Sequence, residues 1–278
     1  PLVSHEWQPL SHKFGHVLAT LRVGAILHDI GHLPCSHIGE FAIERLAEFP
    51  DTTDSASADW KPLLARALES KGMKVKVHEA FGRKLMKLLA NFYSSIRKTT
   101  LSNLVRAAEA VLHSGAYPII SSVLSSPIDA DRIDFVRRDT HFSGLLNSSV
   151  DYTRLFSFFE IRTSENLVDD SHETGGFYIA PGSRAVSEVE KLLWERFQDY
   201  RYIVCHHRVH LYDELVERCI VAMSGTERME SFARLVTQIL QLNDGDNEHA
   251  SMIASNVADA KRLLALLTEL DDCWLEMR

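Results

Sequence analysis

Residues 27–40 hold the densest group of side chains in this chain that could do chemistry. The segment reads LHDIGHLPCSHIGE and contains His28, Asp29, His32 and His37, with a further carboxylate at its end. Neutral imidazole and carboxylate are ligands for hard and borderline divalent metals. On a helix His28 and His32 would share one face, and Asp29 would point about 100° away from His28. Clustered core histidines are the alternative, which the HDxxH and PxxH spacings disfavour, so the segment predicts a metal site.

A second polar segment, residues 128–141, reads IDADRIDFVRRDTH. Asp131 and Asp134 are three residues apart, so they lie near each other on a helix surface. Local ion pairing on a solvated helix is the usual interpretation of such a charge pattern. Aspartates that alternate with arginines also suit a metal and a phosphate together, because arginine binds phosphate oxygens in pairs while carboxylates hold the ion.

Together the two segments resemble the HD-domain metal-dependent phosphohydrolases, and most closely the deoxynucleoside triphosphate triphosphohydrolases of the dGTPase and SAM-and-HD-domain type. Residues 28–40 are similar to the motif HD-x-GH-x-P-F-(S/G)-H-x-GE, and residues 131–139 to D-(K/R)-x-D-Y-x-x-R-D. Residues 196–207 are similar to R-Y-x-M-Y-R-x-V-Y-x-H-(K/H), and residues 77–79 to a THE-like segment. The resemblance runs from about residue 10 to 215 in the family's order. It implies a mostly α fold, an HD-domain helical bundle with a small β-hairpin appendage.

The resemblance also implies a divalent metal ion, held by His12, His28, Asp29 and Asp131. His12 is chosen because residues 10–15 look like the family's F-x-H-S-L-G. One continuous helix over residues 10–30 would separate His12 from His28 by about 24 Å. A break near residues 20–24 is therefore expected, and His5 and His16 are the alternative first ligands. Mixed imidazole and carboxylate ligands suit Mn, Fe, Ni, Co or Zn, and Mg less well.

The implied mechanism uses the histidines around this ion. The metal would polarise a phosphate oxygen and activate water. Either His37 or His78 would be the general acid, a role that suits an ordinary imidazole pKa near 6.5. His32 would orient the phosphate or relay a proton, and Asp131 would complete the catalytic group.

Substrate binding is likewise implied by the resemblance, at Arg132, Phe135, Asp139, Arg196 and Tyr200. The two arginines match phosphate-binding positions, and Asp139 matches an aspartate that binds the sugar 3′-hydroxyl. Phe135 and Val204 stand where the family usually has tyrosine. Loss of two hydroxyl groups weakens sugar recognition, because hydrogen bonds to a substrate hydroxyl carry much of the discrimination.

The expected reaction is hydrolysis of a deoxynucleoside triphosphate (dNTP) to deoxynucleoside and inorganic triphosphate, by a homo-oligomer. The alternative is an HD-type phosphodiesterase or nuclease that acts on single-stranded oligonucleotides or cyclic nucleotides. Single strands need a basic groove with stacking aromatics, for which residues 137–138 and 200–202 are local candidates. A non-catalytic nucleotide-binding regulator would be expected to lack metal ligands, and His28, Asp29 and Asp131 are all present.

Composition bounds these expectations. Of the 278 residues 45% are hydrophobic and 24% charged, as in ordinary soluble domains. No run of about 18 apolar residues predicts a membrane span, and the N-terminal residues lack the features of a signal peptide. Four cysteines without CxxC spacing favour reduced thiols and the cytoplasm. The net charge of −8 argues against broad nucleic-acid binding.

Periodicity predicts one domain over residues 1–278, with an HD core at about 1–150. A hairpin at 151–180 follows, with strands at 155–162 and 176–180, and C-terminal helices at 181–278 complete the nucleotide pocket. Helices are expected at 36–48, 60–71, 77–92, 100–113, 118–125, 184–204, 207–224, 227–242 and 250–269.

Overall fold

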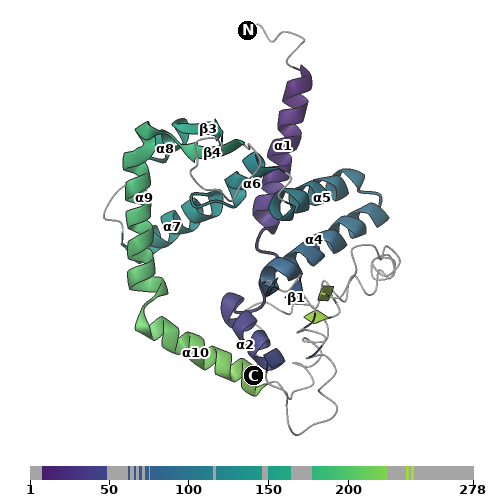
Figure 1. Ribbon diagram of the computed structural model, residues 1–278, viewed down its shortest axis with the longest axis vertical. Coiled ribbons are helices and arrows are strands. Elements are labelled where there is room, and N and C mark those ends of the chain that lie inside the picture. The colour runs from purple at the N-terminus through teal and green to yellow at the C-terminus, as the bar shows by residue number, and fades with distance from the viewer. Residues whose placement is uncertain are drawn as a thin grey trace. The chain divides into compact units, whose positions relative to one another are not determined.

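The computed structural model describes residues 8–48, 76–114, 117–145, 150–163 and 177–223, with short pieces at 62, 66, 69–70, 73–74, 236–237 and 239–240 (Figure 1). The described chain is mostly α-helical with a small antiparallel hairpin, which confirms the predicted fold class. It divides into two compact units, residues 1–25 with 110–210 and residues 26–109 with 211–278. The finer division into core, hairpin and C-terminal helices stays a prediction.

The first unit is built on the packing of two helices, α7 (Ala130–Ser143) against α9 (Val186–Asp199). Strands β3 (Phe159–Thr163) and β4 (Phe177–Pro181) form the hairpin, with Ile161 opposite Ile179. The remaining elements are α6 (Pro118–Leu124), α8 (Tyr152–Ser157), the 3₁₀ turn η3 (Ser183–Ala185) and the π-helical turn η4 (Tyr200–Val204). Their apolar side chains meet in a buried core of Ile133, Val136, Val150, Leu155, Ala185 and Leu192.

Local signals explain where α7 begins and ends. The buried Asp129 side chain accepts a hydrogen bond from the backbone nitrogen of Arg132 at 2.8 Å, which satisfies one of the unpaired amides of the first turn. Gly144 follows the last turn with φ of 75°, the left-handed conformation in which glycine has no steric penalty. The helix is therefore fixed at both ends by its own sequence.

The second unit contains α2 (Ser36–Glu48), α4 (Val77–Ser95), most of α5 (Thr99–His113) and most of α10 (His207–Ala222). Two-residue strands, β1 (Glu69–Ser70) and β2 (Met73–Lys74), pair antiparallel. The core of this unit joins α2 and α4 to α10 and to residues 236, 239 and 240, through Leu33, Ala42, Ile43, Val77, Phe81, Leu85, Ile220, Val236, Ile239 and Leu240. An ion pair between Arg45 and Glu217 at 2.8 Å adds a polar link between α2 and α10.

Several element predictions need correction. The strand expected at 155–162 is wrong in its first half, because Asp151 caps a helix there by accepting from the backbone nitrogen of Arg154 at 3.0 Å. The helix expected at 60–71 ends instead in strand β1, and most of its other residues lie outside the described ones. The helices expected at 227–242 and 250–269 also lie outside, except for helical residues 236–237 and 239–240. Among the described helices, none combines the length and apolarity needed to cross a bilayer.

Candidate active site

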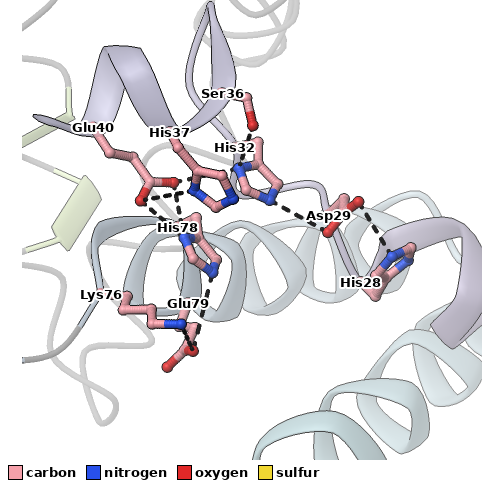
Figure 2. Close-up of polar contacts among 9 residues, drawn as sticks. All are labelled: His28, Asp29, His32, Ser36, His37, Glu40, Lys76, His78 and Glu79. Atoms are coloured by element: carbon pink, nitrogen blue, oxygen red, sulfur yellow. Dashed lines mark hydrogen bonds and ion pairs between the residues drawn. The ribbon is translucent and has the colours of Figure 1, made fainter. Parts of the chain in front are cut away.

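The turn after α1 (Gln8–Leu27) brings His28, Asp29 and His32 together in the second unit. The helix ends at Leu27, so these residues lie in a turn and the condition for a shared helical face is not met. Asp29 lies between the two imidazoles: its Oδ2 is 3.2 Å from Nε2 of His28, and its Oδ1 is 3.4 Å from Nε2 of His32 (Figure 2). The Asp29 side chain remains 60% exposed and can reach a ligand.

A tight turn then leads to His37. Cys35 and Ser36 both have positive φ, 62° and 51°, a conformation that costs a non-glycine residue about 1 kcal/mol. The turn is closed by a hydrogen bond from the Ser36 nitrogen to the Leu33 oxygen at 2.8 Å. The Ser36 hydroxyl lies 3.2 Å from Nδ1 of His32, so the strained turn also contacts the turn that holds His28, Asp29 and His32.

Glu40, one turn into α2, is the centre of the site. Its side chain is buried, and Nδ1 of His78 lies 2.9 Å from its Oε2 and 2.8 Å from its Oε1. Nδ1 of His32 is 3.3 Å from Oε1, and Nδ1 of His37 is 3.8 Å from Oε2. Figure 2 shows the three imidazoles grouped around this single carboxylate. The carboxylate thus faces the same nitrogen of three rings.

A close backbone approach holds His78 in this position. A Cβ atom on Gly31 would lie 2.0 Å from the carbonyl oxygen of His78 and 2.4 Å from the nitrogen of Gly82. Only a residue without a side chain lets the turn at 28–31 lie this near the first turns of α4. The glycine therefore brings His78 to Glu40 across 38 residues of sequence.

His32, His37, Glu40 and His78 could together hold a metal ion, since each offers a ligand atom within 4.8 Å of the others. A tetrahedral ion with bonds of about 2.0–2.1 Å has ligand atoms roughly 3.3 Å apart, which falls inside the observed carboxylate-to-nitrogen range of 2.8 to 3.8 Å. In the described structure the buried Oε1 of Glu40 accepts no hydrogen bond of good geometry, although Nδ1 of His78 lies 2.8 Å and Nδ1 of His32 3.3 Å away. That atom retains capacity for a cation.

The ring packing also suits a proton network. The His32 and His78 rings stack with centroids 4.5 Å apart and planes at 16°, and the His37 ring meets His32 nearly at right angles. Burial lowers the pKa of His32, and it outweighs the opposing effect of Asp29. His32 is thereby favoured in its neutral form, which can accept a proton or bind a metal.

The other predicted site residues lie in the first unit. Asp131, exposed in the first turn of α7, was predicted to share an ion with His28 and Asp29, and this coordination stays a prediction. The Arg132 guanidinium donates hydrogen bonds to the Asp129 carboxylate and the Ser126 carbonyl. Phe135, partly buried, packs against the core of this unit.

Asp139, Arg196 and Tyr200 belong to the packed pair of α7 and α9 with its π-helical extension. The Arg196 guanidinium lies 5.4 Å from the centroid of the Tyr200 ring, a cation–π contact. Burial raises the pKa of Asp199, and the negative charge of Asp139 raises it further. These residues lie on neighbouring elements, and their substrate contacts stay predicted.

The break predicted near residues 20–24 is wrong, because α1 is continuous from Gln8 to Leu27. The choice of His12 as the first ligand assumed such a break, and this choice stays a prediction. The side chain of His12 and all of His5 lie outside the described residues, and His16 is exposed on α1.

Two functional candidates received no role from the sequence. Glu40 was part of the quoted motif, and its spacing of three from His37 could have placed it beside that ring on a helix. Asp199 is fully buried, and neither carboxylate oxygen accepts a hydrogen bond in the described structure. It follows Leu192 by seven residues, two helical turns, which is the signal that it belongs to the buried face of α9.

No family model matches the sequence. The chain is similar to the uncharacterized protein MJ1154 of Methanocaldococcus jannaschii, with 26% identity over 214 residues, which are 76% of this chain and 36% of that protein. It is also similar to the uncharacterized protein YwfO of Bacillus subtilis, with 22% identity over 204 residues, 68% of this chain and 40% of that protein. The chain spans less than half the length of these curated relatives.

Proposed function

We propose that this chain is a metal-dependent HD-domain phosphohydrolase that hydrolyses a dNTP to the deoxynucleoside and inorganic triphosphate. The observation that carries the proposal is the buried Glu40 carboxylate, which faces Nδ1 of His32, His37 and His78. Two of these histidines are the general acids predicted from the sequence. His28 and Asp29 lie in the same turn as His32, which supports a metal site beside these histidines.

Glu40 acts as the positioning residue. By accepting the Nδ1 proton of His78, it fixes the tautomer and leaves Nε2 to exchange a proton with the substrate. The His37 ring is 61% exposed and the His78 ring 17% exposed. His37 therefore meets the substrate more readily, while His78 is held more firmly.

The reaction breaks the bond between the α-phosphorus and the 5′-oxygen of the sugar. Water supplies the oxygen that joins phosphorus, and His37 or His78 donates a proton to the departing 5′-oxygen. His32, neutral because of its burial, accepts the proton released by water or orients the phosphate. His28, Asp29 and the sequence-predicted Asp131 would hold a divalent ion, which when bound would polarise a phosphate oxygen and lower the pKa of water.

The substrate residues proposed are those of the sequence resemblance, with Arg132 and Arg196 for phosphate and Asp139 for the sugar 3′-hydroxyl. Phe135 replaces the usual tyrosine. It lacks the hydroxyl that could bind the sugar, so discrimination between sugars is expected to be weaker. We also propose a homo-oligomer in the cytoplasm, with Mn, Fe, Ni, Co, Zn or Mg as the ion. The thiols of Cys205 and Cys219 are free, which fits a reducing compartment.

The second candidate, a phosphodiesterase or nuclease for single strands, uses the same histidines and metal. It is favoured by the exposed aromatic and arginine side chains at the end of α9, because such surfaces stack bases. Only the products separate the two candidates.

The experiment is a comparison of metal content and dNTP turnover in His28→Ala, His37→Ala and His78→Ala, with the exposed His141→Ala as control. We expect His28→Ala to lose both metal and turnover, and His37→Ala and His78→Ala to keep the metal while turnover falls by about 10²–10⁴. Loss of the metal in His37→Ala and His78→Ala would instead assign the ion to the group of four. Full turnover in His78→Ala would overturn the proposed role of Glu40 and His78.

A further inference from the structure

The first unit contains a pocket of about 340 Å³ whose walls come from α6, α7, α8 and the hairpin of β3 and β4. On α7 the spacing of four places Asp131, Phe135 and Asp139 on one face of the helix. Ile133 and Arg137, which line the pocket, lie on the opposite face. In the described structure no residue of the proposed catalytic or substrate set lines the pocket, so it is a separate site.

One wall of the pocket is aromatic. The ring centroids of Tyr152 and Phe156 lie 6.3 Å apart, and those of Phe156 and Phe159 lie 6.1 Å apart, with planes tilted by 35° and 37°. Tyr152 and Phe159 pack against the core of this unit, whereas Phe156 is 54% exposed. A ligand in the pocket would cover the exposed Phe156 ring, which supplies an apolar driving force for binding.

The size of the pocket limits the ligand. Its volume corresponds to about eleven water molecules at liquid density, which is room for roughly 10–15 non-hydrogen atoms. Away from the aromatic wall, Ile128, Ile133 and Ile179 supply aliphatic surface. A single or fused ring with a short polar substituent fills such a space, whereas a nucleoside triphosphate is too large for it.

Arg137 supplies the positive charge of the pocket. Its guanidinium lies over the Tyr152 ring, 5.0 Å from the centroid. Within the described part of the chain Arg137 forms no ion pair. A guanidinium that contacts a ring through its face keeps the N–H donors in its plane available, and these donors match the two oxygens of a carboxylate. The stacked arginine therefore presents a preformed anion site beside the aromatic wall.

The other charges that line the pocket are already balanced. The Asp129 carboxylate accepts a hydrogen bond from the Arg132 guanidinium, and Asp134 pairs with Arg138 at 3.1 Å. Among the described charges of the pocket, that of Arg137 is thus the one without an opposite charge, and it matches a single negative charge on a ligand. A second negative charge would instead meet the carboxylates of Asp129 and Asp134, which repel it.

We infer that this pocket binds a small aromatic monocarboxylate, whose ring packs against Tyr152, Phe156 and Phe159 and whose carboxylate pairs with Arg137. The aromatic wall selects a ring, the volume selects a short molecule, and the charge balance selects one carboxylate. The inference goes beyond the proposed reaction, because it concerns the face of α7 that carries none of the proposed substrate residues. It therefore holds or fails independently of dNTP hydrolysis.

The test is isothermal titration calorimetry of the full chain with phenylacetate, indole-3-acetate and 2-naphthoate. We expect saturable binding of one molecule per chain, with a Kd of about 10 μM to 1 mM. Phenylacetamide has the shape of phenylacetate without the charge and should bind at least about 10-fold more weakly. Phenylmalonate carries a second carboxylate on the same ring system and should also bind more weakly than phenylacetate.

Three variants assign the binding to the pocket. Arg137→Gln should weaken phenylacetate binding by about 10- to 100-fold and make it equal to that of phenylacetamide. Phe156→Ala should weaken the binding of both by about 2- to 10-fold, because both lose the same ring contact. Arg162→Gln is the control, because Arg162 is 45% exposed on β3 and does not line the pocket. Circular dichroism shows whether each variant keeps the fold.

Methyl NMR locates the ligand directly. The signals of Ile128, Ile133 and Ile179 should shift with phenylacetate, and that of Ile43, buried in the second unit, should not. Equal affinity for phenylacetate and phenylacetamide, or unchanged phenylacetate binding in Arg137→Gln, would overturn the inference. So would tighter binding of phenylmalonate than of phenylacetate, or the absence of saturable binding with all three monocarboxylates.

Discussion

Nδ1 of His78 lies 2.9 Å from the Oε2 atom of Glu40, although the two residues are 38 positions apart in sequence. The same buried carboxylate also lies 3.3 Å from Nδ1 of His32 and 3.8 Å from Nδ1 of His37. A single side chain on α2 thus lies close to three histidines from three segments. Its removal is the most informative change within the second unit.

Glu40→Gln is expected to lower kcat for dNTP hydrolysis by about 10- to 100-fold, with a smaller effect on KM. The amide cannot accept the proton of His78 with the strength of a carboxylate, so the ring loses its fixed tautomer. Steady-state kinetics measure the effect, with circular dichroism to show that the fold is kept. Glu190→Gln is the control, because Glu190 is exposed on α9 and does not belong to the second unit. Wild-type kcat in Glu40→Gln would contradict the role given to this carboxylate.

Gly31→Ala is expected to lower the free energy of unfolding by more than about 3 kcal/mol and to abolish turnover. The new Cβ would lie 2.0 Å from the carbonyl oxygen of His78, and backbone on both sides must move. Urea denaturation measures the loss.

Gly15→Ala is the control for that change, since a Cβ on Gly15 meets nothing within 4 Å on the exposed side of α1. It should raise the free energy of unfolding by about 0.5–1 kcal/mol, because alanine loses less conformational entropy in a helix. If the two glycine variants behave alike, the close approach of the turn to α4 is not as described.

Asp199→Asn is expected to stabilise the first unit at neutral pH by about 1 kcal/mol. Burial raises the pKa of Asp199, and Asp139 raises it further, so the folded state holds its proton to higher pH than the unfolded state. The wild type therefore loses stability as pH rises from the ordinary carboxyl pKa through the raised one. The advantage of Asp199→Asn should appear over that window and vanish below it. Urea unfolding at a series of pH values measures this.

Glu188→Gln is expected to have the opposite effect on stability at neutral pH. The backbone nitrogen of Asp151 and the ammonium of Lys191 hold the pKa of Glu188 below its usual value. Its stabilisation is present above the ordinary carboxyl pKa and is lost as pH falls through the lowered pKa. This variant should therefore be less stable than the wild type at neutral pH, and equal to it in strong acid.

The prediction for Asp199→Asn is contradicted if its free energy of unfolding changes with pH in parallel with that of the wild type. That result would mean that a favourable interaction offsets the burial of the Asp199 carboxylate.

Arg97→Gly is expected to raise the free energy of unfolding by about 1 kcal/mol. Arg97 follows the end of α4 with φ of 59°, and the nitrogen of Lys98 donates to the oxygen of Tyr93 at 2.8 Å across it. This is the glycine-favouring end of a helix, so Arg97→Ala, which keeps the strain, should gain nothing. Thermal unfolding of both variants measures the difference: a higher melting temperature is expected for Arg97→Gly only.

The sequence predicted the parts of the fold that depend on local patterns. The helices expected at 36–48, 77–92, 100–113 and 118–125 are present within a few residues, because their apolar spacing repeats every three to four positions. The break expected in α1 is absent, since Gly24 costs a helix only about 1 kcal/mol and no proline interrupts it. The strand expected from 155 fails because the cap at Asp151 outweighs an alternation of aromatic residues.

The candidate site was predictable in its residues but not in its geometry. The motif placed His28, Asp29, His32 and His37 in one segment. Their convergence with His78 depends on the contact between Gly31 and Gly82, and no periodicity encodes a contact across 51 positions. The position of Glu40 among the three histidines likewise depends on its burial, and the polar residue types around it in the sequence do not predict that burial.

The measurement that tests the central claim most directly is a product assay on the purified, metal-analysed protein. Each dNTP, each ribonucleoside triphosphate and a short single-stranded oligonucleotide would be incubated with Mn or Mg, and the phosphorus products separated. The account predicts inorganic triphosphate from dNTPs, formed by the wild type and lost in Glu40→Gln. Nucleoside monophosphates released from the oligonucleotide, with every dNTP intact, would contradict it.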